Sequence, residues 1–283
     1  MQLAEQLPEK RLARRSFGQA AASYDAAAVL QQEVAQRLLE RLDIMKLEPA
    51  RILDLGCGTG QCIPELMTRY QRADIVALDI AHPMLEQARK RGRWLRRPRC
   101  VCADAERLPF ADASFDLVFS NLMLQWCVDI DTVFTELQRV LRPGGLLLFT
   151  SFGPDTLKEL RDSWAQVDGY THVNAFLDMH DVGDALLKTR FADPVMDVER
   201  ITVTYPDVWK LMRELKQIGA HNVTAGRPRG LTGKLQLQKL VSAYERYRQA
   251  GVLPASYEIV NGHAWATEVS SEAVVALQRL KTL

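Results

Sequence analysis

Residues 51–60 read Arg51-Ile-Leu-Asp-Leu-Gly-Cys-Gly-Thr-Gly60, a short apolar run that ends in three alternating glycines. The run Arg51 to Leu55 has the length and composition of a buried strand, and a helical pattern from Ile63 to Tyr70 follows it. Glycines at such a junction let the backbone approach a ligand where a Cβ would collide. In an open α/β sheet, ligands bind at the carboxyl ends of the strands. The segment therefore predicts either a ligand-binding loop or a plain tight turn between strand and helix.

The spacing of these glycines excludes two common nucleotide-binding loops. A dinucleotide fingerprint requires G-x-G-x-x-G, but counting from Gly56 the last position is Gln61. A phosphate-binding P-loop would continue with Lys and Ser or Thr, and no such pair follows Gly60.

The same alternation of strand and helix continues along the first half of the chain. Further strands are expected at Ile75–Asp79, Cys100–Asp104, Phe115–Ser120 and Leu146–Thr150. Helical patterns at about 83–91 and 133–141 lie between them. Strands and helices at this spacing form βαβ units with a parallel sheet and right-handed crossovers. The predicted fold class is therefore α/β.

The flanking segments differ from this core. Residues 10–45 are expected to be helical, and a helical insertion (Asp207–Ile218 and Lys234–Gln249) lies between two later strands, Val195–Tyr205 and Tyr257–Ala266. Such an insertion is a candidate lid over the ligand end of the sheet. We therefore expect an N-terminal helical segment 1–48, a core 49–205, a helical lid insertion 206–255, and a last strand with a C-terminal tail 256–283. A final helix is expected at 268–283.

The composition of the 283 residues, 47% hydrophobic and 25% charged, excludes a disordered or fibrous chain. The net charge of +1 gives no overall attraction to nucleic acid. Five cysteines without paired CxxC spacing argue against a disulfide framework or a zinc site and favour reduced thiols. No uncharged stretch is long enough to span a bilayer, and residues 1–22 lack the apolar core of a secretory signal. We expect a cytoplasmic protein with no metal and with no nucleic-acid or membrane partner.

Acidic residues end the first three predicted strands or lie close to their ends. Asp79 ends the second strand, where a carboxylate can accept hydrogen bonds from both hydroxyls of a ribose and would repel a 2′-phosphate. Asp104 ends the third strand, where it could accept a hydrogen bond from the exocyclic amine of an adenine. Either acid alone could be a helix N-cap. Together with Asp54 they suit a cationic adenosine ligand better than a pyrophosphate.

At this point the sequence resembles the class I S-adenosylmethionine-dependent methyltransferases. The segments LDLGCGTG, ALD, ADAERLPF, FDLVFSN and LRPGGLLLFTSF stand in that family's order and spacing over about residues 50–152. The resemblance implies a Rossmann-like, seven-stranded, mostly parallel sheet with an antiparallel last strand, and S-adenosylmethionine as cofactor. Asp54 and the glycines would line the methionine part, Asp79 the ribose and Asp104 the adenine. The implied cofactor-binding set is Asp54, Gly56, Cys57, Gly58, Gly60, Asp79, Ile80, Asp104, Ala105, Asn121 and Leu122.

The flanks resemble one branch of that family, the malonyl-acyl carrier protein O-methyltransferases (BioC) of biotin synthesis. The similar stretches are 15–25, 122–126 and 215–220. This resemblance implies that the acceptor is the free carboxylate of a malonyl thioester and that the partner is an acyl carrier protein. The methyl ester would serve the pimeloyl stage of biotin synthesis.

Such a reaction needs positioning more than acid–base catalysis. A carboxylate with a pKa of about 4 is already a nucleophile at neutral pH, and its oxygen must be held about 3 Å from the methyl group. Arg161, His172 and Lys216 are candidates to fix the acceptor, and a planar guanidinium suits that task best. Tyr24 is a candidate to face the sulfonium, because an aromatic face attracts a cation. Each could equally be a surface or structural residue.

A carrier protein is acidic, so a basic docking surface is expected. One candidate patch crowds the helix end and loop at 89–99 around Trp94, and a second comprises Arg227 and Arg229. Either could also be an ordinary solvated surface.

Three other functions remain open. The protein could methylate another small carboxylate or a quinone precursor. It could be a respiratory complex I assembly factor-like arginine hydroxylase, which the lack of a clear mitochondrial presequence disfavours. It could also bind the cofactor without turnover and serve as a partner module.

Overall fold

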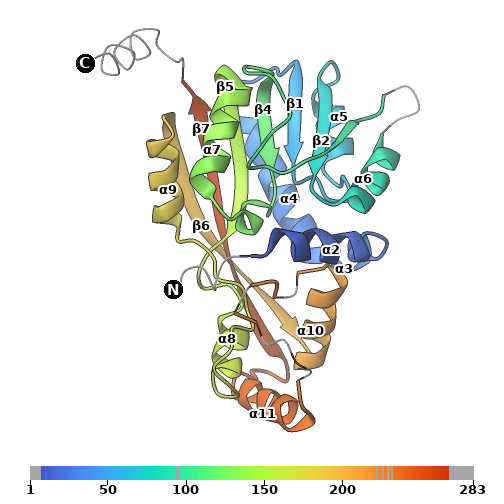
Figure 1. Ribbon diagram of the computed structural model, residues 1–283, viewed down its shortest axis with the longest axis vertical. Helices are drawn as coiled ribbons and strands as arrows, with labels where there is room; N and C mark the ends of the chain where they lie inside the picture. The colour runs from blue at the N-terminus through green and yellow to red at the C-terminus, as the bar shows by residue number, and fades with distance from the viewer. Residues whose placement is uncertain are drawn as a thin grey trace.

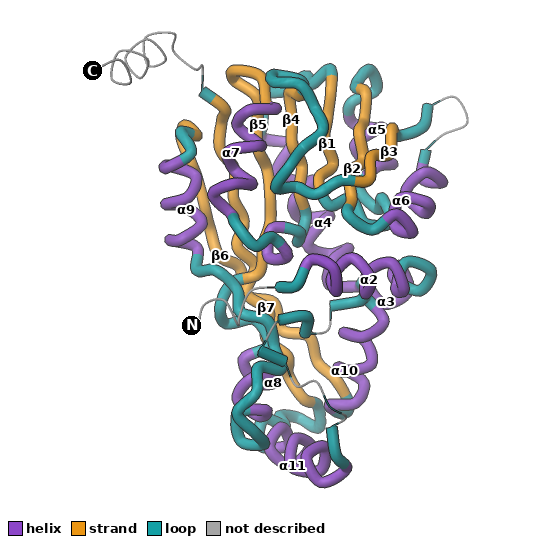
Figure 2. Tube along the Cα trace, in the orientation of Figure 1, coloured by secondary structure: helices purple, strands orange, loops and turns teal. Residues whose placement is uncertain are grey.

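Within residues 8–92, 96–220, 222–224, 226, 227, 230 and 232–267, which the computed structural model describes, seven strands form one sheet (Figures 1 and 2). The strand order is β3-β2-β1-β4-β5-β7-β6. Neighbouring strands from β3 to β5 are parallel, and β7 runs antiparallel to both β5 and β6. This confirms the predicted mostly parallel sheet. The strands are β1 (Arg51–Leu55), β2 (Asp74–Asp79), β3 (Arg99–Cys102), β4 (Phe115–Ser120), β5 (Leu141–Phe152), β6 (Phe191–Tyr205) and β7 (Leu253–Ala266).

Helices cover the two faces of the sheet and one end of it (Figure 1). Those of the first half are α2 (Lys10–Ala20), α3 (Tyr24–Ala27), α4 (Val29–Arg41), α5 (Ile63–Arg69), α6 (His82–Ala88) and α7 (Ile130–Val140). Those of the second half are α8 (Lys158–Trp164), α9 (Met179–Lys188), α10 (Val208–Gln217) and α11 (Lys234–Glu245).

Successive strand residues point to opposite faces of the sheet, and each face has its own core. Leu53 packs into the core that contains α7 and α9, whereas its neighbour Ile52 packs into the core that contains α4 and α5. Both side chains are fully buried. Since β1 is covered on both faces, its apolar residues do not alternate with polar ones, and Asp54 is the one acid buried within the strand.

The strands β6 and β7 form a long antiparallel pair that extends beyond the other strands. The pairing of β5 with β7 ends at Phe152 and Ile259, but β6 and β7 stay paired as far as Tyr205 and Leu253. The helices α8, α10 and α11 pack on this extension around a separate apolar core, seen at the bottom of Figure 1. The two later helices are those predicted for the insertion.

The structure extends or adds elements that the sequence pattern did not predict. The strand β6 begins four residues before the expected Val195, because Asp193 (φ 47°) and Pro194 form a bulge that breaks the alternation on this edge strand. The strand β7 begins at Leu253 and not at Tyr257. The helices α8 and α9 were not predicted. The expected final helix at 268–283 lies outside the described residues.

Candidate functional site

The glycine loop after β1 takes a conformation that favours glycine. Gly56, Gly58 and Gly60 have φ values of 71°, 53° and 77°. A Cβ on Gly56 would lie 2.1 Å from the Met123 side chain, and one on Gly60 would lie 2.9 Å from the Cα of Ala88. The loop is thus packed closely against the segment after β4 and against α6.

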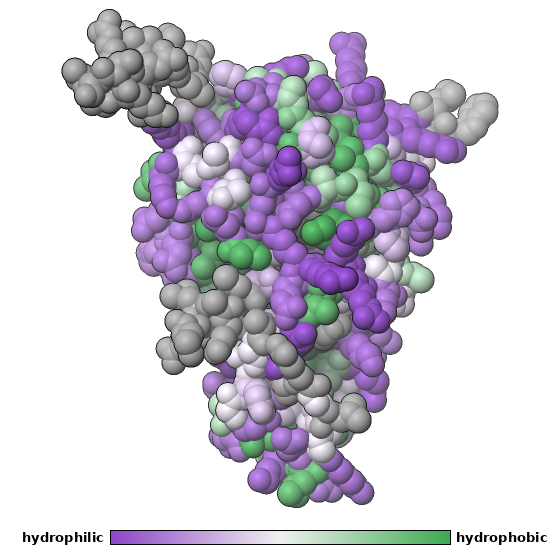
Figure 3. Space-filling model, viewed as in Figure 1, coloured by the Kyte–Doolittle hydropathy of each residue, from purple (hydrophilic) through white to green (hydrophobic). Residues whose placement is uncertain are grey.

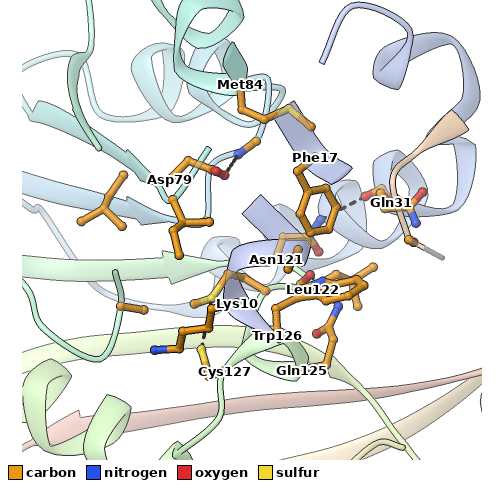
Figure 4. Close-up of a pocket in the computed structure, with 18 of the residues that line it drawn as sticks. Lys10, Phe17, Gln31, Asp79, Met84, Asn121, Leu122, Gln125, Trp126 and Cys127 are labelled. Carbon is orange, nitrogen blue, oxygen red and sulfur yellow. Dashed lines mark hydrogen bonds between the residues drawn. The ribbon is translucent and has the colours of Figure 1, made fainter. Parts of the chain in front are cut away.

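Asp79, at the end of β2, links this loop to the start of α6. Its carboxylate accepts hydrogen bonds from the backbone N–H of Gly58 (2.9 Å) and of Ala81 (2.8 Å). Burial raises the pKa of Asp79 to about 6, although these N–H donors act to lower it. Figure 4 shows the side chain on one side of a cavity, opposite Phe17 and Trp126. Asp79 therefore braces the glycine loop against the segment before α6 and also faces the cavity, whereas the N-cap residue of α6 is Ala81, with no side-chain cap bond.

That cavity lies at the carboxyl ends of the strands and, together with the space where it opens to solvent, has a volume of about 930 Å³. The glycine loop, the ends of β2 and β3 and the segment after β4 form its base, while α2, Tyr24 and the segment after α10 close it. Nine of the predicted cofactor residues line it: Tyr24, Gly56, Gly58, Asp79, Ile80, Asp104, Ala105, Asn121 and Leu122.

A second, adjoining cavity of about 370 Å³ contains Asp54 and Cys57 and shares Tyr24 and Asn121 with the first. The Asp54 side chain is 3% exposed, and its Oδ2 atom is buried without a hydrogen-bond partner. Burial, and then the charge of Asp79, raise the pKa of Asp54 to about 7. A buried acceptor without a donor is costly unless a ligand supplies one. Gly60 lines neither cavity, so its role in the described contacts is packing.

At the other end of the larger cavity, Asp104 has a partner that the sequence analysis missed. The Nζ of Lys10 lies 2.6 Å from Asp104 and 2.6 Å from Glu106. Lys10 begins α2 and lines the cavity (Figure 4), so this ion pair joins the N-terminal helix to the segment that follows β3. Asp104 also accepts from the N–H of Glu106 (3.0 Å).

Several other lining residues were also missed. Phe17 meets Trp126 edge-on, with ring centroids 4.9 Å apart. Asn121 donates from Nδ2 to the carbonyl of Gln31 (3.1 Å), which brings α4 to the cavity wall. No local pattern links these segments, since they meet only in the folded chain. The set missed is Lys10, Ala13, Phe17, Gln31, Leu78, Met84, Ala103, Met123, Gln125, Trp126, Cys127, Phe152, Ile218 and Ala220.

The three acceptor candidates do not line this cavity. Arg161, on α8, donates from Nη2 to the carbonyl of Thr156 (2.7 Å). His172 stacks on Trp164 with centroids 3.7 Å apart, and its Nε2 lies 2.8 Å from Asp168. Lys216 is exposed on α10, two residues before the lining residue Ile218. Their roles in acceptor binding stay a prediction.

Comparison with known proteins identifies the family. A family model described as a methyltransferase domain matches residues 53–149. A relative from Laribacter hongkongensis, named malonyl-acyl carrier protein O-methyltransferase, is 54% identical, and the alignment covers 91% of this chain and 89% of the relative. The chain belongs to the malonyl-acyl carrier protein O-methyltransferase family. A second member of this family, from Methylovorus sp., is 51% identical over 92% of this chain and 90% of its own.

Solved structures of other proteins share the fold of this chain at lower sequence identity. The YcgJ protein of Bacillus subtilis aligns with a TM-score of 0.59 and 16% identity, over 83% of this chain and 99% of its own. Phosphoethanolamine N-methyltransferase 2 of Haemonchus contortus, in complex with S-adenosyl-L-methionine, aligns with a TM-score of 0.51 and 22% identity, over 83% of this chain and 52% of its own. The described part of the chain has no helix long and apolar enough to cross a membrane.

The site fits the cofactor of the methyltransferases. The buried Asp54 Oδ2 has no hydrogen-bond donor, and the ammonium group of a methionine moiety would supply one. Asp79, with two N–H donors already bound, keeps further lone pairs for ribose hydroxyls. No group of three or more His, Cys, Asp or Glu residues within the described ranges could hold a metal ion.

Asp25 ties α3 to the glycine loop. Its carboxylate accepts from Thr59 Oγ1 (2.5 Å) and Gln61 Nε2 (2.8 Å) and pairs with Arg91. Because Asp25 directly follows Tyr24, these bonds hold Tyr24 in its position, where it lines both cavities.

We expect Asp25→Ala to weaken the binding of S-adenosylhomocysteine about 3- to 10-fold, because the lost contacts are worth about 1 kcal/mol in net terms. Isothermal titration calorimetry measures this change. The control is Asp43→Ala, which removes an ion pair with Arg69 that lies outside both cavities. Equal affinities of the two variants would show that Asp25 does not position the cofactor site.

Proposed function

We propose that this protein transfers a methyl group from S-adenosylmethionine to the free carboxylate of a malonyl group carried by an acyl carrier protein. The observation that carries the proposal is the 54% identity to a malonyl-acyl carrier protein O-methyltransferase along almost the whole of both chains. The product would be a malonyl methyl ester, for the pimeloyl stage of biotin synthesis.

The cofactor is S-adenosylmethionine, which supplies an electrophilic methyl group when bound. In the proposed arrangement Asp79 accepts hydrogen bonds from the ribose hydroxyls, and Asp54 accepts one from the ammonium group of the methionine part. Asp104 and Ala105 lie at the adenine end, and Asn121 and Leu122 line the opposite wall. Burial and the nearby Asp79 raise the pKa of Tyr24 far above its ordinary value, so Tyr24 stays neutral and offers its ring and hydroxyl.

The acceptor requires no general base from the protein. A malonyl carboxylate, with a pKa of about 4, is ionised at neutral pH. Among the described residues that line the larger cavity, Lys10 is the cationic side chain, and Asp104 and Glu106 already neutralise it. The acceptor end would therefore be formed by Phe17, Trp126 and neutral amides such as Gln125, which leave the carboxylate reactive and exclude water.

Arg161, His172 and Lys216 remain proposed acceptor residues. Arg161 and His172 already form hydrogen bonds or an ion pair with neighbours in and after α8. A direct role would require the acceptor to contact this part of the protein as well as the larger cavity. Their substitution should affect the use of the acceptor and spare cofactor binding.

The test is transfer of label from radiolabelled S-adenosylmethionine. The protein is incubated with malonyl-carrier protein, with unloaded carrier protein, and with no acceptor. The proposal predicts a base-labile methyl ester on the malonyl form alone. Binding of the cofactor without transfer to the malonyl form would contradict it and favour a module that binds without turnover.

The identity to the malonyl-carrier methyltransferases favours this function over the alternatives raised from the sequence. Transfer to a free small carboxylate or to a quinone precursor, with none to the carrier, would point to a different acceptor. Hydroxylation of an arginine in a protein substrate would point to an assembly factor.

A further inference from the structure

The exposed face of α2 carries three arginines. Arg11, Arg14 and Arg15 are all exposed, whereas Ala13 on the opposite side of the helix is buried and lines the larger cavity. No Asp or Glu occurs in α2. Figure 3 shows strongly hydrophilic residues gathered over this helix in the middle of the molecule.

The exposed face of α10 is also basic. Lys210 and Arg213 are exposed, as is Lys216. The single acid of this helix, Glu214, accepts a hydrogen bond from the hydroxyl of Tyr205 (2.7 Å), on the inner side of α10. The two helices meet, because Ser16 Oγ donates to the carbonyl of Gly219 (2.9 Å), just beyond the end of α10.

We define the α2/α10 surface as Arg11, Arg14, Arg15, Lys210 and Arg213. In the part of the chain that the structure describes, none of these five side chains forms an ion pair or hydrogen bond. The surface lies on the outside of the walls of the cavity, since Phe17 of α2 and Ile218 after α10 line it. Five unpaired positive charges around the mouth of one site form an anion-attracting surface.

The two patches expected from the sequence are less suited to docking. Arg96 donates to the carbonyls of Met67, Tyr70 and Ala73, and Arg99 pairs with Asp74. Arg91 is bound to Asp25. Arg227 pairs with Glu9, while Arg93, Trp94 and Arg229 lie outside the described residues. The structure thus uses Arg91, Arg96, Arg99 and Arg227 to hold elements together. The exposed Arg89, Lys90 and Arg97 form no ion pair with a described residue, but none of the three lines the larger cavity.

We propose that the α2/α10 surface docks the acidic face of the carrier protein and directs the malonyl thioester arm into the cavity beside α2. This inference rests on the proposed function, which requires a carrier with a tethered substrate. Charge complementarity at the edge of an interface acts mainly on association rate and depends on salt.

The test compares three charge-reversal variants with the wild type. R11E/R14E and K210E/R213E alter the surface, and K46E/R72E is the matched control. Lys46 and Arg72 are exposed and form no described ion pair. They precede the amino ends of β1 and β2, at the end of these strands opposite to the cavity. The substrates are malonyl-carrier protein and malonyl-pantetheine, which has the arm but no protein. Fluorescence anisotropy of labelled malonyl-carrier protein gives a Kd that does not depend on turnover.

We expect each surface pair to raise the KM and Kd for malonyl-carrier protein at least about 10-fold at low salt. The kinetics with malonyl-pantetheine, and all properties of K46E/R72E, should stay close to wild type. Carrier affinities of the surface pairs equal to that of K46E/R72E would overturn the inference, even with an active enzyme. Failure of the wild type to methylate either substrate would refute the proposed function, while the Kd series still tests the surface.

Discussion

We expect Asp79→Ala to reduce the affinity for S-adenosylhomocysteine at least about 100-fold. Hydrogen bonds to a charged group contribute about 1.5–3 kcal/mol each, and a ribose offers two hydroxyls, so about 3 kcal/mol or more is lost. The variant also removes the acceptor that holds the N–H groups of Gly58 and Ala81, so the glycine loop loses its fixed shape.

A titration of the variant with the ligand measures this effect. The control is Asp74→Ala, at the opposite end of β2, where the carboxylate forms a half-exposed ion pair with Arg99. Asp79→Asn, which keeps the size of the side chain, separates loss of charge from loss of folding. Affinities of both Asp79 variants within about threefold of that of Asp74→Ala, a difference of less than 1 kcal/mol, would remove Asp79 from the cofactor site.

The second large effect concerns Asp54 and pH. The raised pKa values of Asp54, about 7, and Asp79, about 6, mean that both carboxyls are partly protonated in the ligand-free protein near neutral pH. A cationic ligand binds the ionised forms. The affinity for S-adenosylmethionine should therefore rise between pH 5.5 and 8, in the range of about one unit around these pKa values. Asp54→Asn should lower the affinity about 10- to 100-fold and flatten this rise.

The same groups predict the opposite trend for stability without ligand. A carboxyl whose folded-state pKa is raised binds its proton more tightly in the folded state than in the unfolded state. The free energy of unfolding should therefore fall as pH rises from about 4 through 7, and Asp54→Asn should reduce this fall. Thermal unfolding at each pH, with and without the ligand, measures both trends. Identical pH profiles in the wild type and Asp54→Asn would contradict the assignment of a raised pKa to the buried Asp54 carboxyl.

The sheet could be predicted from the sequence because its signals are local. Each of β1, β2 and β4 is a buried apolar run next to a turn, and each expected strand lies within a few residues of its observed bounds. The helices α8 and α9 were harder to predict. The helix α9 has Gly183 in its middle, and α8 is preceded by Leu157 in a left-handed conformation (φ 55°), so neither shows a clear start and period.

The residues of the site also fall into a part that the local sequence predicts and a part that it does not. The cofactor residues predicted from the motif line the two cavities, except for Gly60, because a strand end and its loop carry their geometry in the local sequence. The rest of the cavity lining could not be predicted, since residues such as Lys10, Gln31 and Ile218 come from three distant segments. Only the packing of α2 and the end of α10 against the strand ends brings them together.

The central claim is that a sulfonium nucleoside occupies the cavity at the ends of β1, β2 and β3. A crystal structure of the protein with S-adenosylhomocysteine tests it most directly. The account predicts the ribose hydroxyls on the Asp79 carboxylate, the amino-acid part beside Asp54, and the adenine between Ile80 and Ala105. A nucleoside bound elsewhere, or one whose ribose makes no contact with Asp79, would contradict it.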